Sequence, residues 1–220
     1  MDAATQATTD GHAGLMDRMY RYQRHIYDIT RKYYLLGRDR TISKLDVPDG
    51  GALLEVGCGT GRNLFLAYRR YPKARLYGLD ISQEMLISAK ATFRYVIPVP
   101  EFRVADATNF NSREFGVDGF ERVLISYALS MIPNWQGAVD ASLASLRPGG
   151  SLHIVDFGQQ ERLPAAFRNL LGGWLRRFHV TPRADLREFL EERAKARNAD
   201  LTFESIGGGY AWRACIITRS

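Results

Sequence analysis

The spacing of apolar residues changes along the chain, from a helical period near the N-terminus to short runs farther on. Between residues 16 and 36, apolar and aromatic side chains recur every three or four positions, which is typical of an amphipathic helix. Gly37 is expected to end this helix, and residues 41–45 to form a second short one. Residues 1–14 are small and polar, so we expect a disordered tail there.

Beyond a turn at residues 48–51, short apolar runs alternate with helical patterns. Strands that alternate with helices indicate a doubly wound α/β fold, with a parallel sheet and helices on both faces. A basic apolar segment at 163–179 and a charged helix at 181–198 interrupt the alternation, and three glycines at 207–209 predict a C-terminal hairpin. The expected strands are 52–56, 75–79, 101–104, 122–126, 151–157, 201–206 and 212–218, and the expected helices between the first five are 63–70, 82–93 and 135–146.

This pattern predicts one α/β domain over residues 15–220. It consists of an N-terminal helical lid at 15–45 and a Rossmann-like core at 46–220, which carries a basic amphipathic insertion at 158–182. The 220 residues are enough for one such domain with its own core.

Composition narrows the class of protein without naming a partner. The chain is 45% hydrophobic and 25% charged, as globular domains are, and its net charge of +6 favours anionic partners. Cys58 and Cys215 are too far apart for a disulfide framework or a metal pattern, so we expect a reduced, cytoplasmic protein without a metal. The N-terminus lacks the features of a signal peptide, and no apolar run reaches the roughly 18 residues that span a bilayer. Any membrane contact is therefore expected to be peripheral.

The strongest motif is a glycine-rich loop after the first predicted strand. The segment from Leu54 to Gly61 reads LEVGCGTG, and glycines let a backbone approach a ligand closely. In doubly wound sheets the ligand lies beyond the carboxyl ends of the strands. Arg62 occupies the position of the third glycine in a dinucleotide fingerprint, and no Lys-Ser/Thr pair follows, so dinucleotide and P-loop sites are disfavoured.

Two carboxylates follow the next two predicted strands. Asp80 ends the second strand, where it can accept hydrogen bonds from two ribose hydroxyls. Asp106 follows the third strand, where it can accept from an adenine amino group or cap a helix.

With these acidic residues, the E-x-G-x-G-x-G loop resembles that of class I S-adenosylmethionine-dependent methyltransferases, over residue 46 to the C-terminus. The resemblance implies a seven-stranded sheet whose seventh strand is antiparallel at the edge. It places the loop glycines beside the methionine part, Asp80 on the ribose, Asp106 near the adenine amine and Met85 on the adenine ring. The cofactor residues it implies are Tyr33, Arg38, Glu55, Gly57, Cys58, Gly59, Gly61, Asn63, Asp80, Ile81, Met85, Asp106, Ala107 and Ser126.

Two basic, aromatic segments bear on the methyl acceptor. Residues 16–45 contain eight basic and three acidic residues, and residues 163–179 interleave arginines with Trp, Phe and Leu. Such segments suit the surface of an anionic bilayer. A lid over the cofactor is an alternative for both, and no motif supports nucleic acid as the partner.

Two strings suggest a narrower resemblance. YQRHIYD, running to YYLLGRD, and SYALSMIP at 126–133 resemble bacterial betaine-lipid N-methyltransferases. The resemblance implies a lipid amine, diacylglyceryl-homoserine, that is methylated three times to diacylglyceryl-trimethylhomoserine. Phosphatidylethanolamine N-methyltransferases share much of this layout and remain an alternative, as do a small-molecule methyltransferase and a non-enzymatic membrane adaptor.

Candidate residues for the chemistry follow from what an amine acceptor requires. It must lose a proton in early rounds, and Tyr27, Tyr127 and His179 are candidates to hold or relay that proton. A homoserine carboxylate calls for a guanidinium. The candidates are Arg38, which could instead bind the cofactor's carboxylate, Arg177 and Arg213.

Overall fold

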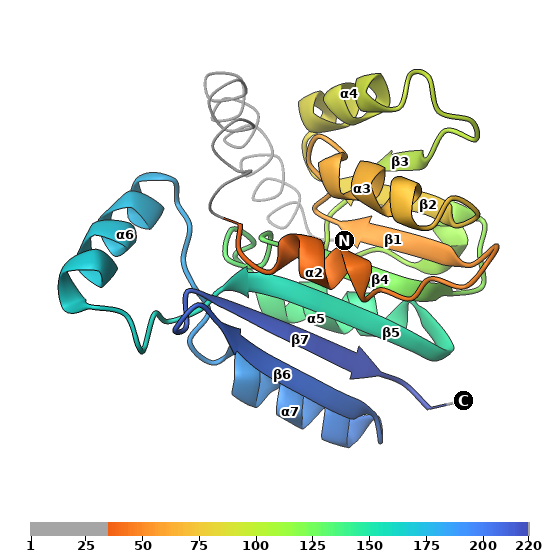
Figure 1. The fold of residues 1–220 in the computed structure, drawn as a ribbon. Helices are drawn as coiled ribbons and strands as arrows, with labels where there is room; N and C mark the ends of the chain where they lie inside the picture. The colour runs from red at the N-terminus through yellow and green to blue at the C-terminus, as the bar shows by residue number, and fades with distance from the viewer. Residues whose placement is uncertain (1–34, 220) are drawn as a thin grey trace, which may run out of the picture.

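A computed structural model describes residues 35–219 as a central sheet with helices on both faces (Figure 1). The tail expected at 1–14, and the helix expected at 16–36 except for its last two residues, lie outside the described residues. Among residues 35–219, no helix combines the length and apolar character that crossing a bilayer requires.

The sheet has seven strands in the order β3-β2-β1-β4-β5-β7-β6. The first five in this order are parallel, so their carboxyl ends share one edge of the sheet, while β7 is antiparallel to both of its neighbours. The strands are β1 Ala52–Val56, β2 Arg75–Asp80, β3 Glu101–Val104, β4 Phe120–Ser126, β5 Leu146–Phe157, β6 Asp200–Ile206 and β7 Ala211–Ile217.

The helices form two layers and one projection (Figure 1). Apolar residues of α2, α3 and α4 pack on one face of the sheet, and those of α5, α7 and the 3-10 helix η1 pack on the other. α6 extends from the body at the edge where β5 ends and buries only Leu171 and Leu175. The helices are α2 Arg38–Ser43, α3 Arg62–Arg70, α4 Gln83–Thr92, η1 Ser112–Phe115, α5 Trp135–Ala144, α6 Ala165–Arg177 and α7 Leu186–Ala196.

The central strands are apolar on both faces because helices cover both. All five residues of β1 are buried, and alternate side chains enter opposite layers: Leu54 packs with α5 and α7, and Leu53 with α2 and α3. This double burial explains why β1 is apolar apart from Glu55. It also makes the end of β1 a rigid support for the loop that follows.

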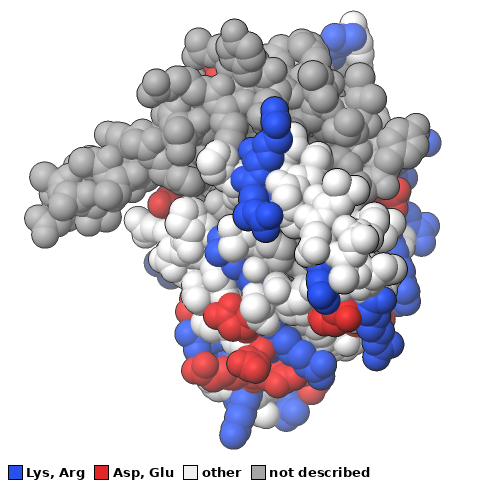
Figure 2. Space-filling view, turned by 90° about the vertical axis from the view of Figure 1, so that its left-hand side faces the viewer, with Lys and Arg blue, Asp and Glu red and all other residues white. Residues whose placement is uncertain are grey.

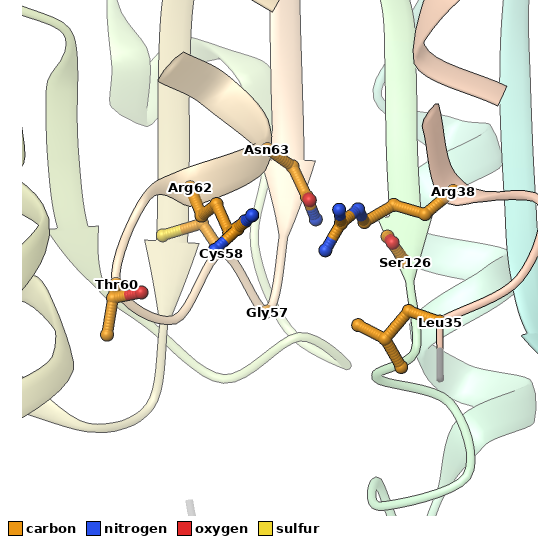
Figure 3. A pocket seen from close by; sticks show the side chains of 8 residues that line it. All are labelled: Leu35, Arg38, Gly57, Cys58, Thr60, Arg62, Asn63 and Ser126. Carbon is orange, nitrogen blue, oxygen red and sulfur yellow. The ribbon is translucent and has the colours of Figure 1, made fainter. Parts of the chain in front are cut away.

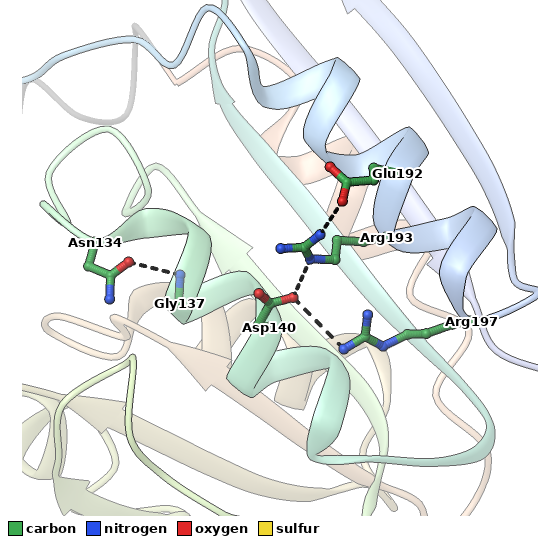
Figure 4. Close-up of polar contacts among 6 residues, drawn as sticks. All are labelled: Asn134, Gly137, Asp140, Glu192, Arg193 and Arg197. Carbon is green, nitrogen blue, oxygen red and sulfur yellow. Dashed lines mark hydrogen bonds and ion pairs between the residues drawn. The ribbon is translucent and has the colours of Figure 1, made fainter.

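Charged side chains join α5 to α7 (Figure 4), and two aromatic rings also meet between these helices. Asp140 of α5 accepts from Arg193 Nε at 2.7 Å and lies 3.8 Å from Arg197, and the rings of Trp135 and Phe189 meet edge to face. Asn134 caps α5 by accepting from Gly137 N at 3.1 Å. Partly exposed ion pairs contribute little to stability, so the buried rings are the main support of this contact.

The alternation of strands and helices, the C-terminal hairpin and Ser82 as the N-cap of α4 are confirmed. Two expectations were wrong in detail. The short helix begins at Arg38 rather than at 41, because Gly37 adopts a left-handed conformation and becomes its N-cap. The antiparallel strand is not at the edge, since β7 lies between β5 and β6 and leaves β6 outermost.

Candidate functional site

The glycine-rich loop leads from β1 into α3 at the carboxyl edge of the sheet. Its three glycines have positive φ angles, and the last of them, Gly61, is the N-cap of α3. At Gly57 a Cβ atom would lie 2.8 Å from the Cβ of Ala128, which belongs to the segment after β4. Only glycine therefore lets the loop pass so close to the end of β4, and the two segments together border one pocket.

Eight residues line this pocket, and they come from three places in the fold (Figure 3). The segment that enters α2 contributes two, the loop and the start of α3 contribute five, and the end of β4 contributes one. Sequence analysis had selected five of the eight. It missed Leu35, Thr60 and Arg62, although Arg62 had already drawn attention as the residue that breaks the dinucleotide fingerprint. The lining residues are Leu35, Arg38, Gly57, Cys58, Thr60, Arg62, Asn63 and Ser126.

Hydrogen-bond donors dominate the lining. Arg38 is 3% exposed; its Nε donates to Asp39 at 2.9 Å, and its guanidinium points into the pocket (Figure 3). The buried Arg62 Nε and Ser126 Oγ have no hydrogen-bond partner among the described residues. A buried donor without a partner costs about 1–3 kcal/mol, so this lining favours a ligand that brings acceptors.

Glu55 supports two residues that line the pocket, Asn63 and Cys58. Glu55 is buried at the end of β1 and accepts from Asn63 Nδ2 at 2.7 Å, which ties the first turn of α3 to the sheet. Burial, reinforced by the carboxylates of Asp80 and Glu55, raises the pKa of the Cys58 thiol well above its ordinary value. The thiol therefore stays neutral and forms a wall of the site rather than a nucleophile.

Asp80 connects the loop to β2. One carboxylate oxygen accepts from the backbone N–H of Gly59 at 2.8 Å, and the other accepts from that of Ser82 at 3.0 Å. The side chain thus holds the middle of the glycine loop against the end of β2.

The residues expected around an adenine follow β2 and β3. Asp106 is half-buried, and its Oδ1 accepts from both the N–H and the hydroxyl of Thr108 at 2.8 Å, so it stabilises its own turn as well. Met85 is 4% exposed in the first turn of α4, and Ile81 and Ala107 are half-buried. None of these four residues lines the pocket of Figure 3, so their contact with an adenine remains a prediction.

Tyr127 was predicted to hold or relay a proton, and its surroundings disfavour that role. Its hydroxyl donates to the backbone carbonyl of Leu36 at 2.6 Å, and its ring meets Phe157 edge to face. Burial, together with the nearby Asp156 carboxylate, raises the pKa of Tyr127 above its ordinary value. A buried phenol that already donates to a carbonyl is poorly suited to take a proton from an acceptor, so these surroundings disfavour the proton-relay role predicted for Tyr127.

The remaining candidates are dispersed. The buried guanidinium of Arg213 forms a two-pronged ion pair with Glu204 across the hairpin, at 2.7 and 3.1 Å, so the hairpin already uses its charge. Arg177 and His179 are exposed at the C-terminal end of α6, outside the pocket lining. Tyr27 and Tyr33 lie outside the described residues.

A buried carboxylate orders the segment after β4 that sequence analysis had singled out. Asp156 accepts from the N–H groups of Ser130 and Phe157 at 3.1 and 2.7 Å. Arg183 donates to the carbonyls of Leu129 and Ile132 in the same segment. These bonds hold the segment that follows Ser126 against β5. Among the described residues, no three His, Cys, Asp or Glu side chains gather as a metal site.

Comparison with known proteins shows that the fold is that of methyltransferases. Residues 53–150 match the family model described as a methyltransferase domain. The solved structure of the plantazolicin methyltransferase BpumL, in complex with a triazolic desmethylPZN analog and SAH, superposes with a TM-score of 0.70 at 14% identity and covers 98% of this chain and 100% of that one. The chain thus has the class I methyltransferase fold, and residues 53–150 are similar to methyltransferase domains.

Two curated relatives with different named functions are similar to part of this chain. The ubiquinone/menaquinone biosynthesis C-methyltransferase UbiE of Desulfotalea psychrophila is 30% identical over 59% of this chain and 53% of its own length. The phosphatidylethanolamine N-methyltransferase of Cereibacter sphaeroides is 32% identical over 56% of this chain and 63% of its own length. The matched part of the chain therefore spans less than two thirds of either relative.

Proposed function

We propose that this chain is an S-adenosylmethionine-dependent methyltransferase that acts on a lipid amine. The observation that carries the proposal is the pocket at the carboxyl edge of the sheet. There Gly57 lets the glycine loop pass close to the segment after β4, and Arg38 and Ser126 present buried donors to the pocket that the two segments border. The similarity of residues 53–150 to methyltransferase domains and the SAH-bound structure of BpumL support the choice of cofactor.

The residues at the pocket fit this cofactor in charge and shape. The guanidinium of Arg38 is suited to the carboxylate of the methionine part, which is the anion that the donor-rich lining favours. Asp80 is suited to the ribose hydroxyls, because a carboxylate can accept about four hydrogen bonds. Met85 and Ile81 follow β2, and Asp106 and Ala107 follow β3. We propose that these four side chains surround the adenine.

The chain's own contribution to the reaction is alignment. When bound, S-adenosylmethionine supplies a methyl group on a sulfonium sulfur, and transfer leaves a neutral thioether that needs no acid. The loop at 57–61 and Arg38 would hold one reactant, while the segment after Ser126 would border the acceptor. Such orientation can lower a barrier by about 7–11 kcal/mol.

The surface of α6 supports a lipid as the acceptor. The helix contains no acidic residue, and Phe167 and Leu170 are 44% and 74% exposed beside the exposed Arg168. Figure 2 shows basic side chains projecting among uncharged ones on the side of the molecule where α6 lies. Exposed apolar and basic side chains together suit an anionic membrane surface. α6 also packs, through Leu171 and Leu175, in the same cluster as Tyr127, which directly follows the pocket residue Ser126.

Among lipid amines we propose diacylglyceryl-homoserine, which would be trimethylated to a betaine lipid. The strings at 22–39 and 126–133 support this choice.

The test supplies labelled S-adenosylmethionine to the full chain with diacylglyceryl-homoserine, phosphatidylethanolamine and demethylmenaquinone in parallel vesicles. We expect label in the first lipid, in up to three increments. Preference for phosphatidylethanolamine would favour the function of the Cereibacter relative, and preference for the quinone that of the Desulfotalea relative. Labelling of none of them would overturn a lipid acceptor.

Membrane binding through α6 gives a second prediction. Leu170→Asp should weaken co-sedimentation with anionic phosphatidylglycerol vesicles by about tenfold, because it places a like charge and a polar group on the contacting face. Ile97→Asp is the matched control. Ile97 is 89% exposed, but it precedes β3 and so lies at the opposite edge of the sheet. Equal losses in the two variants would contradict docking through α6.

A further inference from the structure

The hydroxyl of Tyr127 holds a turn rather than a substrate. Leu36, whose carbonyl accepts from it at 2.6 Å, is 91 positions away in the chain and directly precedes Gly37 and Arg38. Tyr127 itself is 2% exposed and has a φ of 55°, a left-handed conformation that is costly for a residue with a side chain. The side chain is therefore held in one orientation, by Phe157 on its ring and by Leu36 on its hydroxyl.

The turn at Gly37 decides where Arg38 points. Gly37 has a φ of 80° and is the N-cap of α2, and its carbonyl accepts from both the N–H and the hydroxyl of Thr41 at 2.8 and 2.9 Å. A Cβ atom on Gly37 would lie 2.4 Å from the Cδ1 of Ile206. The chain thus changes direction between a carbonyl fixed by Tyr127 and a helix whose first residue is Arg38.

Arg38 in turn reaches the pocket only from this position. α2 has six residues and packs on α3 and β5, and the guanidinium of Arg38 extends from its first residue toward Ser126 and Asn63 (Figure 3). Because the side chain of Arg38 is long, a rotation of the turn would displace its guanidinium relative to Ser126 and Asn63. The geometry of Arg38 therefore depends on the Tyr127 bond, although the two side chains have no hydrogen bond between them among the described contacts.

We infer that Tyr127 is a positioning residue for the carboxylate end of the bound cofactor and acts through the Leu36 carbonyl and Arg38. This inference rests on the proposed function, because it takes S-adenosylmethionine as the ligand. It replaces a role in proton transfer by a role in cofactor affinity. It also assigns a purpose to the strained conformation directly after β4.

The test compares two ligands that differ at the end facing Arg38. S-adenosylhomocysteine carries the carboxylate, whereas 5′-methylthioadenosine keeps the nucleoside and lacks the amino-acid end. Tyr127→Phe should raise the calorimetric Kd for S-adenosylhomocysteine by about fivefold, the loss expected for one neutral hydrogen bond, and leave the Kd for methylthioadenosine unchanged. Arg38→Met should raise the first Kd by about thirtyfold and spare the second. In the Arg38→Met background, Tyr127→Phe should have no further effect.

Two more variants separate this inference from a general loss of structure. Tyr71 donates to the carbonyls of Ile42 and Ser43 at the other end of α2, at 3.0 Å each, so Tyr71→Phe loosens the same helix away from Arg38 and should leave both Kd values unchanged. Gly37→Ala disturbs the turn directly and should reproduce the ligand-selective loss even if Tyr127→Phe folds poorly.

Equal losses for the two ligands, or additive losses in the double variant, would overturn the role of Tyr127 while leaving the methyltransferase proposal intact. If the unmodified chain bound neither ligand, the proposed function itself would fall, and this inference with it.

Discussion

Asp80→Ala is expected to weaken the binding of S-adenosylhomocysteine by about 100-fold, or about 3 kcal/mol. The carboxylate is proposed to accept hydrogen bonds from two ribose hydroxyls. Hydrogen bonds to a charged acceptor contribute about 1.5–3 kcal/mol each. The same side chain fixes the glycine loop through Gly59 N at 2.8 Å, so its removal also loosens the support of the pocket. Titration calorimetry measures the loss.

Two further variants define what that result means. Asp80→Asn keeps one oxygen that can accept from the loop but loses the charge, so we expect an intermediate affinity. Asp118→Ala removes an exposed acidic residue far from the loop in sequence and should change nothing. Unchanged affinity in Asp80→Ala would show that the ribose contact is misassigned. A collapse of the thermal transition would instead indicate that Asp80 is chiefly structural.

The second large effect concerns the pH dependence of stability. His153 lies on β5, is 5% exposed, and has its Nε2 2.9 Å from the Ser151 hydroxyl. Burial, with the nearby Arg122 and Arg213, lowers the pKa of His153 from 6.5 to about 4. The folded state therefore binds the proton less tightly than the unfolded state. The stability that the neutral ring contributes is fully present above pH 6.5 and is lost as the pH falls toward 4.

The size of this loss follows from the shift. A change of one pKa unit corresponds to 1.36 kcal/mol, so the free energy of unfolding should fall by about 3 kcal/mol between pH 8 and pH 4 through His153 alone. His153→Gln cannot titrate and should remove this share of the slope in urea unfolding experiments. His179→Gln is the matched control, since it removes an exposed histidine instead of a buried one. An unchanged slope in His153→Gln would contradict a buried neutral histidine.

Much of the fold could be read from the chain because it depends on local patterns. The run Ala52–Val56 is apolar apart from Glu55, glycines follow it directly, and Ser82 caps α4 through its own hydroxyl. Each of these signals lies within a few residues of the element that it predicts. They were enough to place the loop and Asp80 at one edge of the sheet.

The remaining features depend on contacts between distant segments. Tyr127 carries the side chain of a plausible acid or base, and only the bond to Leu36, 91 residues away, shows that its hydroxyl is already in use. No sequence pattern predicted that Arg213 would form an ion pair with Glu204. In the sequence, Arg62 indicates only that the dinucleotide fingerprint is absent. In the structure, it lines the pocket and its Nε is buried. The hairpin was predicted, but which of its strands would join β5 could not be, because that depends on pairing between distant segments.

The position of β7 between β5 and β6 has a consequence for biosynthesis. The ribosome synthesises β6 before β7, so β6 emerges without the strand that it pairs with, and the edge of β5 that pairs with β7 stays open until β7 has emerged. Closure of the sheet therefore waits until β7 has been synthesised. The nascent chain must meanwhile carry an unpaired strand edge, the kind of surface on which other chains associate.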